Sequence, residues 1–142
     1  MSLIYTIIHL NYLTVFVVTI AGFLFGWLWY SPVLFARAWM AEMKFSGEKM
    51  HAAKPGMARL MATSFACTFV STFAVSALIT AHRSESVLKG AMYGGFLGVM
   101  LVSPRLLNGG LWENRSVSLQ AITLGHEILL FVMQGAIFAA LL

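Results

Sequence analysis

Two ionisable residues lie next to each other within an apolar segment near the end of the chain. His126 and Glu127 follow Arg115 by about 11 residues, which at about 1.5 Å per helical residue places them roughly 16 Å along a helix. That depth is near the centre of a bilayer, where an ionisable side chain costs on the order of 2.5 kcal/mol or more and by default marks a functional position. The chemistry open to Glu127 there is proton exchange or the binding of a cationic group.

A polar stripe runs along the same segment. Thr123, Glu127 and Gln134 are four and seven residues apart, so they share one face of a helix. One hypothesis is that this face lines a cavity, together with hydroxyl groups of the second apolar segment, and that Glu127 binds a ligand there. The alternative is that a neutral or hydrogen-bonded Glu127 only joins two helices, since burial favours the uncharged form of a carboxyl group.

His126 is expected to serve other neighbours than Glu127, because consecutive helical side chains point roughly 100 degrees apart. No pair of Cys or His residues has the spacing of metal ligands, so we expect no metal and no other cofactor. We predict a packing role for His126 and keep it as a candidate ligand contact. The single cysteine, Cys67, falls inside an apolar run, which indicates a buried thiol and excludes an intrachain disulfide.

A second polar group lies where the apolar segments end. Its members are Tyr30, Arg37, Arg105 and Arg115. Tyr30 is a further candidate contact of a ligand, and arginines at this level are expected to contact lipid phosphate. For Arg115, an ion pair with Glu113 or Glu42 that fixes the loops is an equal alternative. The sequence shows no Ser-His-Asp arrangement, phosphate-binding loop or carboxylate pair, so we assign no catalytic residue.

Four apolar segments position these residues. Of the 142 residues, 60% are hydrophobic and only 10% are charged, whereas about a quarter are charged in a soluble domain. A membrane-spanning helix needs about 20 mostly apolar residues. The chain therefore has room for one all-α, polytopic membrane four-helix bundle and for no separate soluble domain. The predicted spans are residues 10–35, 60–80, 87–102 and 117–142.

The basic residues indicate how these spans cross the membrane. The connections after the first and third spans hold seven lysines and arginines, and the opposite side holds two. The positive-inside rule therefore places the long loop, residues 36–59, in the cytoplasm and both chain termini outside. The start of this loop, residues 36–45, is expected to form an interfacial helix with Trp39 toward lipid. The basic residues are scattered between apolar runs, so nucleic acid is not an expected partner.

A pattern of glycine, serine and proline occurs twice, and the second copy begins 72 residues after the first. Gly22-x-x-x-Gly26 with Ser31-Pro32 recurs as Gly94-x-x-x-Gly98 with Ser103-Pro104. An even number of spans separates the copies, so a true duplication would give a parallel repeat of two similar hairpins. Chance is the alternative, because glycine-rich apolar helices often stop at Ser-Pro. Glycines four apart allow close helix packing, within the chain or in a homo-oligomer, and each proline predicts a kink or a stop.

Several motifs resemble those of a known family. They are Trp29-Tyr30-Ser31-Pro32-x-Leu34-Phe35, the following Trp39-Met40, and the turn Glu113-Asn114-Arg115 before the last span. With them the chain resembles, over nearly its whole length, the small bacterial membrane proteins known as domain of unknown function seventeen-sixty-one. The resemblance implies a multi-pass protein of the bacterial inner membrane with no assigned activity. It also implies an aromatic residue more often than histidine at the position of His126, which argues against a histidine-centred mechanism.

Two main classes of function follow. The first is a non-enzymatic protein that binds or moves a small molecule or ion in an interhelical pocket lined by Glu127, Gln134 and Thr123. The second is a structural or accessory membrane subunit that packs against a partner protein or lipid through its glycines and arginines. An intramembrane enzyme is the least supported class, because no complete catalytic set is visible in the sequence.

Overall fold

The computed structural model describes residues 3–44, 56–82 and 86–142. Within these ranges the chain is helical without β-strands, and four helices are long and apolar enough to cross a membrane. They are α2 (Tyr12–Trp29), α5 (Met57–Ala81), the continuous helix Val87–Trp112, and α8 (Val117–Ala140). The prediction of an all-α membrane protein with four apolar helices is confirmed. Residues 45–55 of the predicted loop and Arg83 lie outside the described residues.

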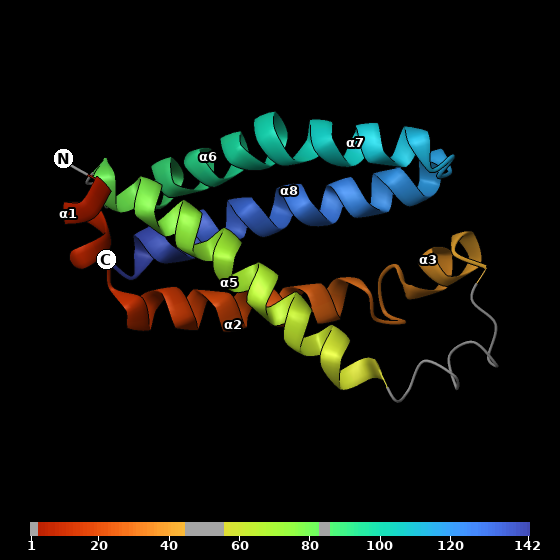
Figure 1. Ribbon diagram of the computed structural model, residues 1–142, viewed down its shortest axis with the longest axis horizontal. Coiled ribbons are helices and arrows are strands. Elements are labelled where there is room, and N and C mark those ends of the chain that lie inside the picture. Colours follow the sequence, from red (N-terminus) through yellow and green to blue (C-terminus); the bar gives the residue numbers. More distant parts are fainter. Residues whose placement is uncertain (1–2, 45–55, 83–85) are drawn as a thin grey trace.

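Helix α8 lies at the centre of the bundle. It contacts α2, α5 and both parts of the third helix, α6 (Val87–Leu97) and α7 (Ser103–Trp112). Figure 1 shows α6 and α7 along one side of α8, α2 on the other side, and α5 crossing obliquely. Both chain termini and the short helix α1 (Leu3–Ile8) lie at one end, and α3 (Ala36–Glu42) lies at the other.

The buried core occupies the half of the bundle near the termini. The buried residues of α5 are Thr72, Val75, Ser76 and Ile79, all in its C-terminal half. Val75 and Ile79 pack there with apolar residues of α2 and α8. Toward its N-terminal end, α5 diverges from α8 (Figure 1). The bundle is therefore closed at one end and open between helices at the other.

The first Ser-Pro pair ends a helix, as proline predicts. Helix α2 stops at Trp29, and a turn over Ser31 and Pro32 leads into the short helix α3. Trp39 of α3 is half-buried, and its ring packs edge-on against Tyr30 with the ring centroids 5.8 Å apart. Helix α3 continues beyond the end of α2 and contacts α8 (Figure 1). The lipid contact of Trp39 stays a prediction.

The second Ser-Pro pair lies inside a helix, which differs from the predicted loop over residues 103–116. A π-helical turn, Gly98–Val102, joins α6 to α7, and Pro104 occupies the first turn of α7. Proline is tolerated in a first helical turn because its missing N–H has no partner to lose there. The Ser103 N–H and hydroxyl both donate to the carbonyl oxygen of Gly98, with the hydroxyl at 2.8 Å. The change of helix type thus accommodates the proline.

The glycines of the two pattern copies have different neighbours. A Cβ atom at Gly94 would collide with the main-chain carbonyl oxygen of Phe131, so α6 and α8 touch backbone to backbone. Gly22 and Gly26 instead face side chains of α8, and a Cβ atom at Gly22 would lie 3.0 Å from Leu130. The copies thus differ in both their glycine contacts and their Ser-Pro structure, and the duplication stays a prediction.

The close contact of α6 with α8 generates a stability prediction. We expect Gly94→Ala to lower the free energy of unfolding by about 1–3 kcal/mol or more, because the helices must move apart to admit the methyl group. In Gly109→Ala, a Cβ atom would have no neighbour within 4 Å, and the better helix former should raise stability by up to about 1 kcal/mol. Thermal unfolding in one detergent measures both. Equal melting temperatures for the two variants would contradict the packing described.

Candidate functional site

A cavity of about 730 Å³ lies between α2, the N-terminal half of α5, and α8. It forms because α5 diverges from α8 and because glycines on α2 leave space opposite it. Most of its lining is apolar or aromatic and includes Phe23, Trp27, Met57, Met61, Leu130 and Phe131. Concave apolar sites with a few polar groups are the usual form of a small-molecule site.

His126 and Glu127 supply a polar pair in the wall of this cavity. His126 Nδ1 lies 3.0 Å from Glu127 Oε1. The prediction that the two residues serve different neighbours is therefore wrong, because the two methylene groups of glutamate let its carboxylate reach back to the adjacent ring. The side chain of His126 is only 10% exposed, whereas that of Glu127 is 28% exposed. The carboxylate is thus the accessible member of the pair.

Aromatic rings enclose the imidazole of His126. Phe25 stacks on it with the ring planes 14° apart and the centroids 5.6 Å apart, and the Trp29 ring lies 6.0 Å away. Its Nε2 is buried without a hydrogen-bond partner among the described residues. A Cβ atom at Gly26 would lie 3.2 Å from Nε2, so the glycine makes room for the ring. His126 therefore packs within the bundle and fixes Glu127 through Nδ1.

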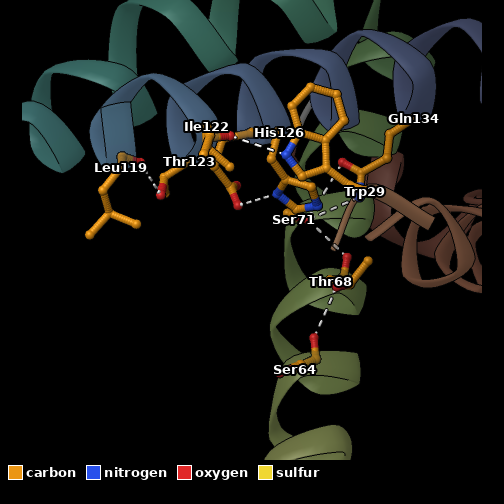
Figure 2. Close-up of polar contacts among 10 residues, drawn as sticks. Trp29, Ser64, Thr68, Ser71, Leu119, Ile122, Thr123, His126 and Gln134 are labelled. Carbon is orange, nitrogen blue, oxygen red and sulfur yellow. Dashed lines mark hydrogen bonds and ion pairs between the residues drawn. The ribbon is translucent and has the colours of Figure 1, made fainter. Parts of the chain in front are cut away.

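The pair lies near the end of α2 and near the middle of α8. His126 is level with Gly26, which is three residues or about 4.5 Å before the end of α2, a helix that is about 27 Å long. On α8, which spans Val117–Ala140, the same residues lie close to the midpoint. The predicted position near the bilayer centre stays a prediction. The indole N–H of Trp29, the last residue of α2, bonds the Ile122 carbonyl oxygen at 3.2 Å (Figure 2).

Tyr30 immediately follows α2 and also lines the cavity. Its ring centroid lies 5.2 Å from that of His126. Burial and then the negative charge of Glu127 raise the pKa of its phenol above the ordinary value, while a hydrogen bond with Thr123 lowers it. Tyr30 is therefore a neutral hydroxyl beside the carboxylate. Thr123 is not among the described lining residues, and its own hydroxyl donates to the Leu119 carbonyl oxygen at 2.9 Å.

Gln134 lies outside the described cavity lining and joins two helices. Its fully buried amide donates to Ser71 Oγ at 3.1 Å and to Thr72 Oγ1 at 2.9 Å. Figure 2 shows the Gln134 side chain directed from α8 toward α5. The predicted polar stripe is therefore divided, because Glu127 faces the cavity and Gln134 holds α8 to α5 where the two helices meet.

The arginines of the predicted boundary group are exposed and lie outside the described cavity lining. Arg115 pairs with Glu113 at 2.6 Å, which is one of the two alternatives that the sequence left open. The other acidic residue, Glu42, instead accepts a hydrogen bond from Ser116 Oγ at 2.5 Å and so ties α3 to the start of α8. Lipid contacts of Arg37 and Arg105 stay a prediction.

Cys67 and Trp39 are among the lining residues that were not predicted from the sequence. Cys67 is exposed and lines the cavity, so the prediction of a buried thiol is wrong. The cause is the divergence of α5, which leaves this part of the helix uncovered. Trp39 also lines the cavity. Trp39 follows Trp29-Tyr30 within one short segment of the sequence. This spacing could have indicated that the rings meet, because aromatic residues of one short segment often come together in a turn.

The fold and the cavity define a polytopic membrane protein with a histidine–glutamate pair of α8 in the wall of an interhelical cavity. The model of the family described as protein of unknown function (DUF1761) matches residues 13–139. The chain therefore belongs to this family, as the Trp-Tyr-Ser-Pro resemblance implied. Comparison with curated proteins and with solved structures gives no match.

The hydrogen bonds between Gln134 and α5 predict a smaller loss of stability when the amide is removed than when its two hydroxyl partners are removed. Gln134→Leu should lower the free energy of unfolding by about 1 kcal/mol or less, because the Ser71 and Thr72 hydroxyls still donate to the Thr68 carbonyl oxygen. The double variant Ser71→Ala/Thr72→Val should cost more, about 1–3 kcal/mol, since it leaves a buried amide unpaired. Melting of both variants and their combination in one detergent measures this. A larger loss for Gln134→Leu than for the double variant would contradict the assignment.

Proposed function

We propose that this protein binds a small molecule in the cavity between α2, α5 and α8, with Glu127 as the main polar contact and His126 and Tyr30 beside it. The observation that carries the proposal is the oriented carboxylate of Glu127, which is the charged acceptor among the described lining residues of a largely apolar cavity. A carboxylate that served only packing would be expected to point into the core and bond a neighbouring helix. In this chain Gln134 makes that interhelical bond instead.

The geometry supports binding over catalysis. His126 Nδ1 fixes the carboxylate of Glu127, and the Tyr30 ring closes the same side of the cavity. Such preorganised polar groups on an apolar wall favour one orientation of a ligand. The proposed role is therefore to bind or carry a ligand. Of the residues predicted to bind it, Thr123 would act through Tyr30, and Gln134 would act through the helix contact.

The ligand is proposed to enter from the membrane. Trp27 is 72% exposed and Met61 is 44% exposed, and both residues line the cavity. They lie on helices that are apolar enough to span a bilayer, so their exposed surfaces face lipid in the proposed arrangement. The cavity then opens sideways between α2 and α5. A ligand taken up this way is a membrane-soluble molecule of modest size.

We further propose that the α3 end of the bundle lies in the cytoplasm of a bacterium and that both termini lie outside the inner membrane. The support is the distribution of lysine and arginine, seven against two, and the arrangement in Figure 1, which separates α3 from the termini. The mouth of the cavity then lies toward the cytoplasmic leaflet, because Tyr30 and Trp39 line its wall.

A second candidate function is that of an accessory subunit. A hollow of about 450 Å³ lies along α5 and is lined in part by Ala66, Val70 and Ala74. These small residues would accept a helix of a second copy or of a partner protein. Occupation of this hollow would make α5 an interface, and the ligand cavity would then be an incidental space between the helices.

Native mass spectrometry of the gently purified full chain tests the main proposal. We expect the wild-type protein to retain a nonprotein mass and Ser64→Phe to lose it, because Ser64 lines the cavity and a phenyl group would fill it. The matched control is Ala62→Phe, an exposed position on the same helix outside the described lining of both hollows. This control should retain the mass.

The same experiment separates the two candidates. Retention of the mass by Ser64→Phe, or no retained mass in any sample, would overturn the binding proposal. A stable dimer in the spectrum that Val70→Trp dissociates would favour the accessory subunit, since Val70 is 65% exposed and lines only the smaller hollow. The melting temperature of each variant shows whether it has folded.

A further inference from the structure

We infer that the ligand is a lipophilic cation, a molecule with a substituted ammonium or similar weakly hydrated positive centre on an apolar body. This inference rests on the proposed function and names the class of molecule that the same cavity takes. It is carried by the sign of the charge in the cavity and by the kind of polar group that the cavity offers.

The charge of the cavity selects against anions. None of its described lining residues is a lysine or an arginine, and Glu127 is the one carboxylate among them. Two like charges about 4 Å apart repel by several kcal/mol when water is largely excluded. A cation at the same place neutralises Glu127, and a buried charge is stable only when it is paired. His126 is engaged with Glu127 through Nδ1 and therefore holds the carboxylate rather than an incoming anion.

The hydrogen-bonding groups of the cavity also suit a cation. The hydroxyls of Thr63, Thr68 and Ser71 line the cavity from α5, and each donates to a carbonyl oxygen of its own helix, so towards a ligand each can only accept a hydrogen bond. The charged acceptor among the described lining residues is a single carboxylate, and most of the remaining wall is apolar or aromatic. A substituted ammonium has few N–H groups to satisfy. It needs charge neutralisation and apolar contact, and this cavity provides both.

Aromatic rings are placed to stabilise such a centre. The rings of Tyr30 and Trp39 meet at 65° beside the carboxylate, and Trp27 and Phe23 line the neighbouring wall. A weakly hydrated cation is attracted to the faces of such rings, and most strongly where water is excluded. The combination of one carboxylate with several rings recognises a bulky cation and offers little to an anion.

Two ions of the same shape and opposite charge test the inference. Tetraphenylphosphonium and tetraphenylborate are both lipophilic and tetrahedral, so a difference in their binding reports the sign of the charge. With full-length protein in nanodiscs of neutral lipid, we expect saturable binding of the phosphonium and no saturable binding of the borate. Glu127→Gln should weaken phosphonium binding at least tenfold, whereas Ala62→Phe should leave it unchanged. The melting temperatures of both variants show that they have folded.

The outcomes distinguish failure of the cation inference from failure of the proposed ligand-binding function. Equal binding of both ions, or phosphonium binding that Glu127→Gln leaves unchanged, would overturn the cation assignment. If phosphonium does not bind while native mass spectrometry shows a retained mass that Ser64→Phe removes, the cation inference fails and the binding function stands. If no mass is retained and neither ion binds, both fail.

Discussion

The bond from the Gln134 amide to Ser71 and Thr72 determines where α5 leaves the bundle. On the terminal side of this bond α5 packs into the core, and on the other side it diverges from α8 (Figure 1). The α6 helix cannot fill the space that this leaves, because its glycines lock it backbone to backbone against the opposite face of α8. A membrane helix has no hydrophobic drive to close on its neighbour. The cavity is therefore a consequence of one polar contact and one glycine contact.

Neighbouring side chains support Glu127 at the wall of the cavity. An ionisable side chain within an apolar span is costly and by default marks a functional position. His126 donates to the carboxylate and is itself packed among rings of α2, with space provided by Gly26. These supports hold the carboxylate at the wall of the cavity. In the proposed function, a ligand would meet a carboxylate whose orientation is already fixed, which would reduce the entropy lost on binding.

Composition and hydropathy were sufficient to predict the four helices, because the 20-residue apolar length and the low charge reflect a direct constraint of the bilayer. Composition and hydropathy did not predict that the helix continues through Pro104, because this depends on the π-helical turn before Ser103. They identified Glu127 as a polar residue within an apolar span, and its depth in the membrane stays a prediction. The contact with His126 was missed because spacing along a helix gives the direction of the Cβ atom and not the reach of a flexible side chain.

The cavity bordered by α5 includes Cys67 in its wall, and the single cysteine of the chain permits a direct measurement. In native membranes, the rate at which a maleimide modifies Cys67 is compared with that of Ala62→Cys in a Cys67→Ala background. Ala62 is closer to the end of α5 and lies outside the described cavity lining. We expect faster modification of Cys67, because the cavity leaves room for the reagent beside its thiol, whereas lipid is expected to cover the face of α5 that carries Ala62. Slower or equal modification of Cys67 would show that no such cavity exists in the membrane.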